Sequence, residues 1–151
     1  MINIEKLEKK VIETLESVGW NKSRCINIEN QIKVLEEEGY IPFEYANKII
    51  KSFDGLYISP ERGYGVKSYV GDVEFDVLGS GSGEYDRVEL IEELSKESIF
   101  PLGMVFGQWF LYVGRSHKIY MSDGSKLYLL GENIEEFLNN TIAIGNKPVE
   151  I

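Results

Sequence analysis

Apolar residues recur at helical spacing through the first third of the chain, which predicts three amphipathic helices. The first is expected over residues 4–18, with Asn3 as N-cap and Gly19 as its stop. A second, shorter helix follows, and a third has Pro42 at its first position and breaks at Asp54-Gly55. The three apolar faces consist of Ile4, Leu7, Val11, Leu15 and Val18, then Ile28, Ile32 and Leu35, and then Ala46, Ile49, Ile50 and Phe53.

After Gly55 the spacing of apolar residues changes from the helical period to the alternation that is typical of strands. Residues 72–78 alternate charged and apolar side chains, as a strand with one face in water does. Asp123-Gly124 predicts a hairpin between the last two strands. Strands are expected at residues 56–59, 72–78, 104–113, 118–122 and 126–130. The remaining segments are expected to be a flexible glycine loop at 79–83, a helix over 85–95, a turn at 100–103, a last helix from Asn133 and a less ordered tail from Asn140.

This order of elements predicts an α+β fold. Strands joined by short turns give a mainly antiparallel sheet, packed by the N-terminal helices, one mid-chain helix and a C-terminal helix. A length of 151 residues is typical of one domain, so residues 1–151 are expected to share one core. Trp20 and Trp109 are assigned to that core.

The sequence favours a cytoplasmic protein. Residues 1–10 carry charges throughout and contain no apolar segment of a secretory signal. No stretch approaches the eighteen apolar residues of a spanning helix. The single cysteine, Cys25, has no internal disulfide partner, which fits a reducing compartment.

The chain is acidic, and its charge is concentrated in one segment. Sixteen Lys and Arg against twenty-five Asp and Glu give a net charge of −9. Residues 54–93 hold ten of the acids and only Arg62, Lys67 and Arg87 as bases, a net charge of −7. This sign disfavours nucleic acid and anionic membranes as partners. A basic protein is the natural electrostatic complement.

No catalytic, cofactor-binding or metal-binding residue is predicted. With one histidine and one cysteine, a zinc site of nitrogen and sulfur ligands is excluded, and no segment resembles a calcium-binding loop. His117 lies in a polar turn and is interpreted as solvated, and Cys25 as a small buried hydrophobe rather than a reactive thiol. The glycines at 63–65 and 79–83 complete no phosphate-binding motif.

Two ordered sets of short motifs run through the chain. The first comprises Gly19-Trp20, Arg24, Leu35, Gly39, Ala46 and Phe53-Asp54-Gly55-Leu56. The second comprises Phe75-Asp76, Phe100-Pro101-Leu102-Gly103, Ile119-Tyr120-Met121-Ser122-Asp123-Gly124, Leu127-Tyr128 and Leu130-Gly131. Over about residues 15–140 this arrangement resembles the SUKH superfamily, and in particular its third subgroup. Asp54-Gly55 stands where the family would have two glycines, a change that a turn tolerates.

The resemblance implies a small α+β immunity protein that is not an enzyme. Such a protein is made beside a polymorphic toxin, often a nuclease with a basic cleft, and neutralises that cognate toxin by direct binding. Variable loops such as 59–71 and 79–83 are where specificity for the toxin is expected. The candidate toxin-binding residues are acidic or aromatic members of the acidic segment, namely Glu61, Tyr64, Tyr69, Asp72, Glu74, Asp76, Glu84, Tyr85 and Asp86.

The sequence is also compatible with other interpretations. The same fold can serve as a non-catalytic adaptor or regulatory scaffold. The acidic segment can be a solvated face that protects a sheet edge from aggregation. Asp72, Glu74 and Asp76 can also serve acid–base hydrolysis, although their spacing places them in a row on one strand face. Tyr57 is interpreted as sheet packing rather than as an interface residue.

Overall fold

The structure is a computed structural model that describes residues 2–60 and 71–151. Within these residues it contains one antiparallel sheet whose strands lie side by side in chain order. The strands are β1 (Tyr57–Ile58), β2 (Val73–Phe75), β3 (Ile99–Val105), β4 (Trp109–Gly114), β5 (Ile119–Ser122), β6 (Leu127–Gly131) and β7 (Val149–Glu150). The predicted α+β class with a mainly antiparallel sheet is confirmed.

Helices precede, interrupt and follow the strands. They are η1 (Ile4–Lys6), α1 (Lys9–Ser17), α2 (Glu29–Glu38), α3 (Glu44–Phe53), α4 (Val77–Gly81), η2 (Tyr85–Arg87), α5 (Val88–Ser95), α6 (Ile134–Leu138) and the π-helical turn η3 (Asn139–Ile144). The three predicted N-terminal helices are confirmed with two changes. The first is split into η1 and α1, and the third begins after Phe43 as N-cap, so Pro42 lies before the helix.

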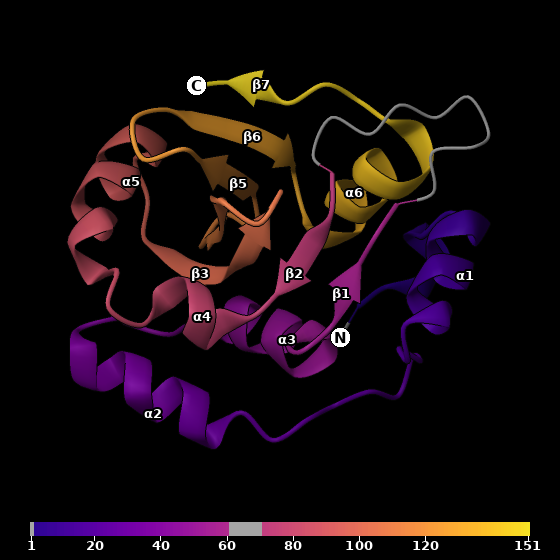
Figure 1. The fold of residues 1–151 in the computed structure, drawn as a ribbon, viewed down its shortest axis with the longest axis horizontal. Coiled ribbons are helices and arrows are strands. Elements are labelled where there is room, and N and C mark those ends of the chain that lie inside the picture. The colour runs from indigo at the N-terminus through magenta and orange to yellow at the C-terminus, as the bar shows by residue number, and fades with distance from the viewer. Residues whose placement is uncertain (1, 61–70) are drawn as a thin grey trace.

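The sheet has two unlike faces. Figure 1 shows it curled, with α5 on one side and α2 and α3 below. One face, called here the helix-covered face, carries Phe75, which stacks on Phe53 of α3 with ring centroids 5.2 Å apart. Phe53 in turn stacks on Trp20, so the core extends from the sheet through α3 to the N-terminal segment. The opposite face carries the alternate residues of the same strands.

The segment from 72 to 83 differs from its prediction. The strand ends at Phe75, and residues 77–81 form α4 instead of continuing as a strand and a flexible loop. The Asp76 side chain caps α4 by accepting from the Gly79 amide, and the buried Asp54 carboxylate accepts from the Val77 amide. A Cβ at Gly81 would lie only 2.8 Å from the Pro101 ring. Glycine therefore serves here for close packing of α4 on β3, not for flexibility.

The strand predicted over 104–113 is a hairpin of two strands. The chain reverses at Phe106 and Gly107, which both have positive φ, and the Gln108 amide bonds to the Val105 carbonyl. The predicted turn at 100–103 is instead part of β3, where a shift of register between Pro101 and Gly103 marks a bulge. The spacing of hydrophobic residues alone does not reveal a turn that lies inside a continuous apolar segment.

The C-terminal tail is more ordered than expected. Asn133 caps α6 by accepting from the Glu136 amide, as predicted. After α6 the chain continues through η3, whose Thr141 and Ile142 are buried, and then adds β7 to the edge of the sheet beside β6. Of the two tryptophans, Trp20 lies in the core, whereas Trp109 is only half-buried and stacks on Tyr128.

Candidate protein-binding surface

A row of side chains crosses four strands on the face opposite the helix-covered face. Tyr57 of β1 pairs with Glu74, Glu74 with Met104, and Met104 with Phe110 of β4. Directly paired residues of antiparallel strands project to the same side, so these four side chains adjoin one another. Tyr57 is 52 % exposed and the other three are half-buried. These four residues are called here the cross-strand row.

Acidic groups stand at both ends of the cross-strand row. At one end the Tyr57 hydroxyl donates to the Asp72 carboxylate at 2.8 Å, and this bond raises the pKa of Tyr57. At the other end the Arg87 guanidinium lies 4.2 Å from the Phe110 ring centroid and donates to Glu84 at 2.6 Å. The bond to Glu84 raises the pKa of Arg87. Contacts thus join the acids near residue 72 to those near residue 84.

A second cluster lies beside Glu84 where η2 meets the end of α2. Tyr85 is 41 % exposed and packs edge-on against Tyr40, with centroids 5.0 Å apart. The Glu38 carboxylate accepts from the Ser82 hydroxyl and from the Gly83 amide, both at 2.7 Å, and these bonds lower the pKa of Glu38. Asp86 is exposed next to Tyr85. This cluster therefore extends the acidic surface onto α2.

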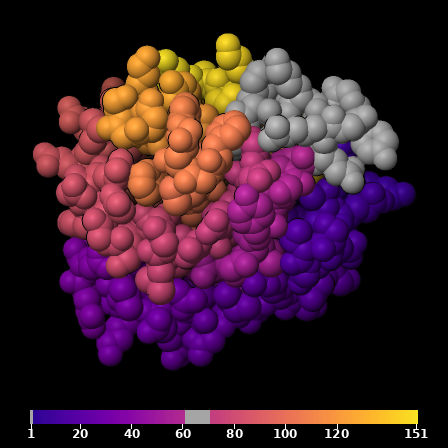
Figure 2. Space-filling model, in the orientation of Figure 1, coloured from indigo at the N-terminus to yellow at the C-terminus, as the bar shows by residue number. Residues whose placement is uncertain are grey.

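The predicted candidates fall into three groups. Asp72 and Glu74 border or belong to the cross-strand row, and Glu84, Tyr85 and Asp86 lie at η2. Asp76 instead caps α4, so the predicted strand face of three acids in a row is wrong. Glu61, Tyr64 and Tyr69 lie outside the described residues. In Figure 2 the residues from about 71 to 98, in pink, and those from about 100 to 125, in orange, lie on the same face of the molecule.

Several members of this surface were not predicted as interface residues from the sequence, and Tyr57 was predicted to lie elsewhere. Tyr57 was expected to pack into the sheet, but more than half of it is exposed. Phe110 and Met104 were placed in an apolar strand, and only their register with Glu74 reveals their position. Glu38, the last residue of α2, was not among the predicted interface residues. Phe106 is 46 % exposed at the tip of the β3–β4 hairpin, where its amide bonds to the Asp72 carbonyl.

Removing the Asp76 carboxylate is expected to destabilise the fold. Because an N-cap side chain satisfies a free helix amide, Asp76→Ala should lower the free energy of unfolding by about 1 kcal/mol. Urea denaturation followed by circular dichroism measures this loss. Asp76→Asn is the matched control and should stay within a few tenths of a kcal/mol of the wild type, since Asn caps as well as Asp. Equal losses in both variants would contradict a capping role.

The residues weighed for chemistry occupy ordinary surroundings. His117 is exposed, as expected, and its ring stacks on that of Tyr45 with centroids 3.7 Å apart. Cys25 is exposed, so its assignment as a buried hydrophobe is wrong. It lies one residue after Arg24, whose bonds to α3 fix this loop on the surface. In the described ranges 2–60 and 71–151, no group of three or more His, Cys, Asp or Glu is arranged to hold a metal ion.

The fold and this surface define an α+β protein with an exposed acidic and aromatic face suited to protein binding. The sequence model of the SUKH-3 immunity protein family matches residues 7–143, and the chain belongs to this family. Membership supports an immunity role and implies a cognate toxin as partner. No curated protein and no solved structure gives a significant match. Among the described residues, no helix has the length and apolar character that crossing a bilayer requires.

Proposed function

We propose that this protein, as one domain over residues 1–151, is a non-catalytic immunity protein that neutralises a cognate toxin by stoichiometric binding. The toxin domain is proposed to be a nuclease, and both proteins meet in the cytoplasm. The observation that carries the proposal is the cross-strand row, because it links the acids around Asp72 and Glu84 into one surface.

Charge supports a basic partner. A nuclease cleft holds phosphates with Lys and Arg, so its potential is positive. Asp72, Glu74 and Asp86 present carboxylates on the proposed interface, while only Arg87 among its members is basic, and Glu84 already pairs with it. Complementary potentials of this kind speed association and orient the partners. The acidic surface would then occupy the cleft in place of the substrate.

The apolar members of the row supply anchoring area. Aromatic residues and Met are enriched in interface cores, and aromatic side chains often dominate binding energy. Tyr57 is held by Asp72 and Phe110 by Arg87, so both rings already have fixed partners before binding. A side chain that is ordered in the free protein loses less conformational entropy when it is buried in a complex.

A titration tests the proposal directly. The toxin domain encoded beside this gene is mixed with increasing amounts of the purified protein, and its residual nuclease activity is measured. We expect activity to fall in proportion to the protein added and to vanish at a fixed molar ratio, with a complex of that ratio in light scattering. Unchanged activity, or inhibition by far less than one equivalent, would contradict stoichiometric neutralisation.

A further inference from the structure

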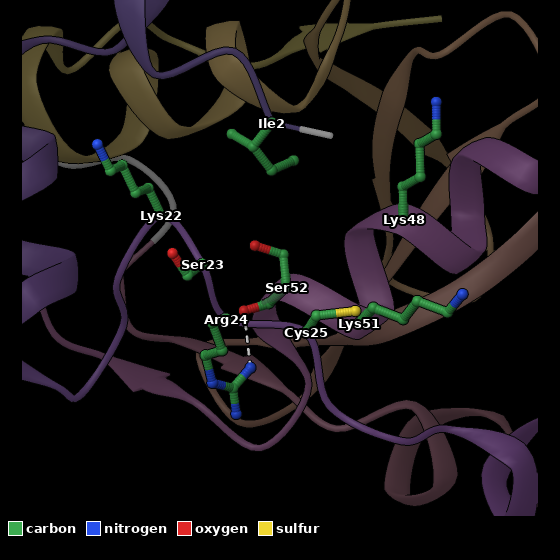
Figure 3. Close-up of a pocket in the computed structure, with 8 residues that line it drawn as sticks. All are labelled: Ile2, Lys22, Ser23, Arg24, Cys25, Lys48, Lys51 and Ser52. Carbon is green, nitrogen blue, oxygen red and sulfur yellow. Dashed lines mark hydrogen bonds between the residues drawn. The ribbon is translucent and has the colours of Figure 1, made fainter.

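A pocket on the other side of the molecule has the opposite charge. It lies between the loop at residues 22–25 and α3, and has a volume of about 210 Å³. Its lining residues are Ile2, Lys22, Ser23, Arg24, Cys25, Lys48, Lys51 and Ser52 (Figure 3). Four of the sixteen basic residues of the chain thus line one pocket to which no described acidic residue contributes. Since α3 packs on the helix-covered face, this pocket is separate from the cross-strand row.

The basic groups of the pocket are only partly neutralised. Lys48 pairs with Glu44 at 3.4 Å in an exposed contact, which contributes little. Arg24 donates to the Ser52 and Asp54 carbonyls, each at 2.7 Å, and so neutralises the negative end of α3. Lys22 and Lys51 have no ion pair within the part of the chain that the structure describes. The pocket is therefore positive in a protein of net charge −9.

A buried hydroxyl also points into this pocket. Ser52 is 8 % exposed, and its oxygen accepts from the Trp20 indole N–H at 3.0 Å. No described group accepts the hydroxyl proton of Ser52 in return. Figure 3 shows this hydroxyl directed toward the space below Ile2, with Lys22 and Lys48 on opposite sides. A buried donor without an acceptor costs free energy, which an acceptor atom of a ligand would recover.

We propose that this pocket binds a small phosphate monoester. A phosphate monoester carries between one and a half and two negative charges near neutral pH and three acceptor oxygens. Lysine binds phosphate as a point charge, whereas the arginine fork binds phosphate or carboxylate through paired hydrogen bonds. The fork of Arg24 is already bonded to backbone carbonyls, so the lysines supply the charge that a ligand would meet. Ile2 gives the pocket an apolar wall that suits the organic part of an ester.

The single cysteine offers a direct readout. Cys25 is exposed and lines the pocket, so a bound ligand shields it from alkylation. The rate at which neutral iodoacetamide alkylates Cys25 is followed by intact mass, with phenyl phosphate as the probe. We expect saturable protection by phenyl phosphate, weaker protection by inorganic phosphate and none by phenol at equal concentration. High salt should weaken the protection.

Variants locate the binding. Lys22→Gln with Lys48→Gln should weaken the apparent affinity for phenyl phosphate at least tenfold. Lys9→Gln with Lys147→Gln is the matched control: it removes the same charge, and Lys9 pairs with Glu13 as Lys48 does with Glu44. Absence of protection by phenyl phosphate, or equal loss in both double variants, would overturn the proposal. Equal affinity for inorganic phosphate would overturn the assignment to an ester.

Discussion

Charge reversal at Asp72 and Glu74 is expected to slow association with the toxin roughly 10- to 100-fold, because electrostatic steering contributes factors of this size. Both carboxylates lie on the face of the cross-strand row, and Asp72 also holds Tyr57 in place. The variant Asp72→Lys with Glu74→Lys replaces attraction by repulsion at the proposed interface. Stopped-flow association rates at low and high salt measure the effect, which should shrink as salt rises.

A control variant with the same change of net charge distinguishes a local effect at the interface from the effect of the protein's total charge. Glu29 and Glu36 line the groove between α2 and α3, away from the cross-strand row. Glu29→Lys with Glu36→Lys changes the net charge by the same amount and should leave the association rate within about twofold of the wild type, since distant exposed charges are screened. Association rates and salt dependence that are alike in both variants would place the interface elsewhere.

Alternation along residues 72–78 was enough to predict which side chains face the core. Phe75 is buried and Glu74 is half-exposed on the other face, as the period of two requires. The alternation wrongly predicted that the strand continues after Phe75. Asp76 caps α4, but a charged residue at this position also fits the solvent-facing side of a strand. A carboxylate that caps a helix and one that faces water look alike in a sequence, and only the following backbone distinguishes them.

The glycine segment shows why α4 could not be predicted. Glycine has poor helix propensity, so a run containing Gly79 and Gly81 reads as a loop. In the structure the missing side chain at Gly81 lets α4 approach Pro101 and Leu35, and this tertiary packing outweighs propensity. Such a requirement depends on residues far along the chain and leaves no local signal.

The candidate surface was predictable in composition but not in arrangement. The concentration of acids in residues 54–93 predicts Asp72, Glu74, Glu84 and Asp86 as candidates from the sequence alone. Their connection depends on the register of β2, β3 and β4 and on Arg87 over Phe110, which are long-range contacts. Tyr57 was misassigned because an aromatic in a short strand predicts burial, whereas β1 lies at the edge of the sheet.

Truncating Phe53 is expected to have the largest effect on stability. Phe53 is fully buried between Trp20 and Phe75, with ring centroids 6.0 and 5.2 Å away. Phe53→Ala should lower the free energy of unfolding by about 3–5 kcal/mol, since it removes a large buried side chain and leaves a cavity. That loss is a large part of the roughly 5–15 kcal/mol that stabilises a typical domain. Urea denaturation followed by tryptophan fluorescence measures it.

Phe106→Ala is the control, because it deletes the same side chain at a half-exposed position and should cost less than about 1 kcal/mol. Equal losses in both variants would contradict the central place of Phe53 in the core. The Phe53 stack also bears on the proposed interface, since it fixes Phe75 while the adjacent residue Glu74 lies on the face of the cross-strand row. Phe53→Leu retains most of the packing, so it should stay folded but show faster amide hydrogen exchange in β2. Weaker toxin binding by that variant would connect the core on one face of the sheet to the acidic surface on the other.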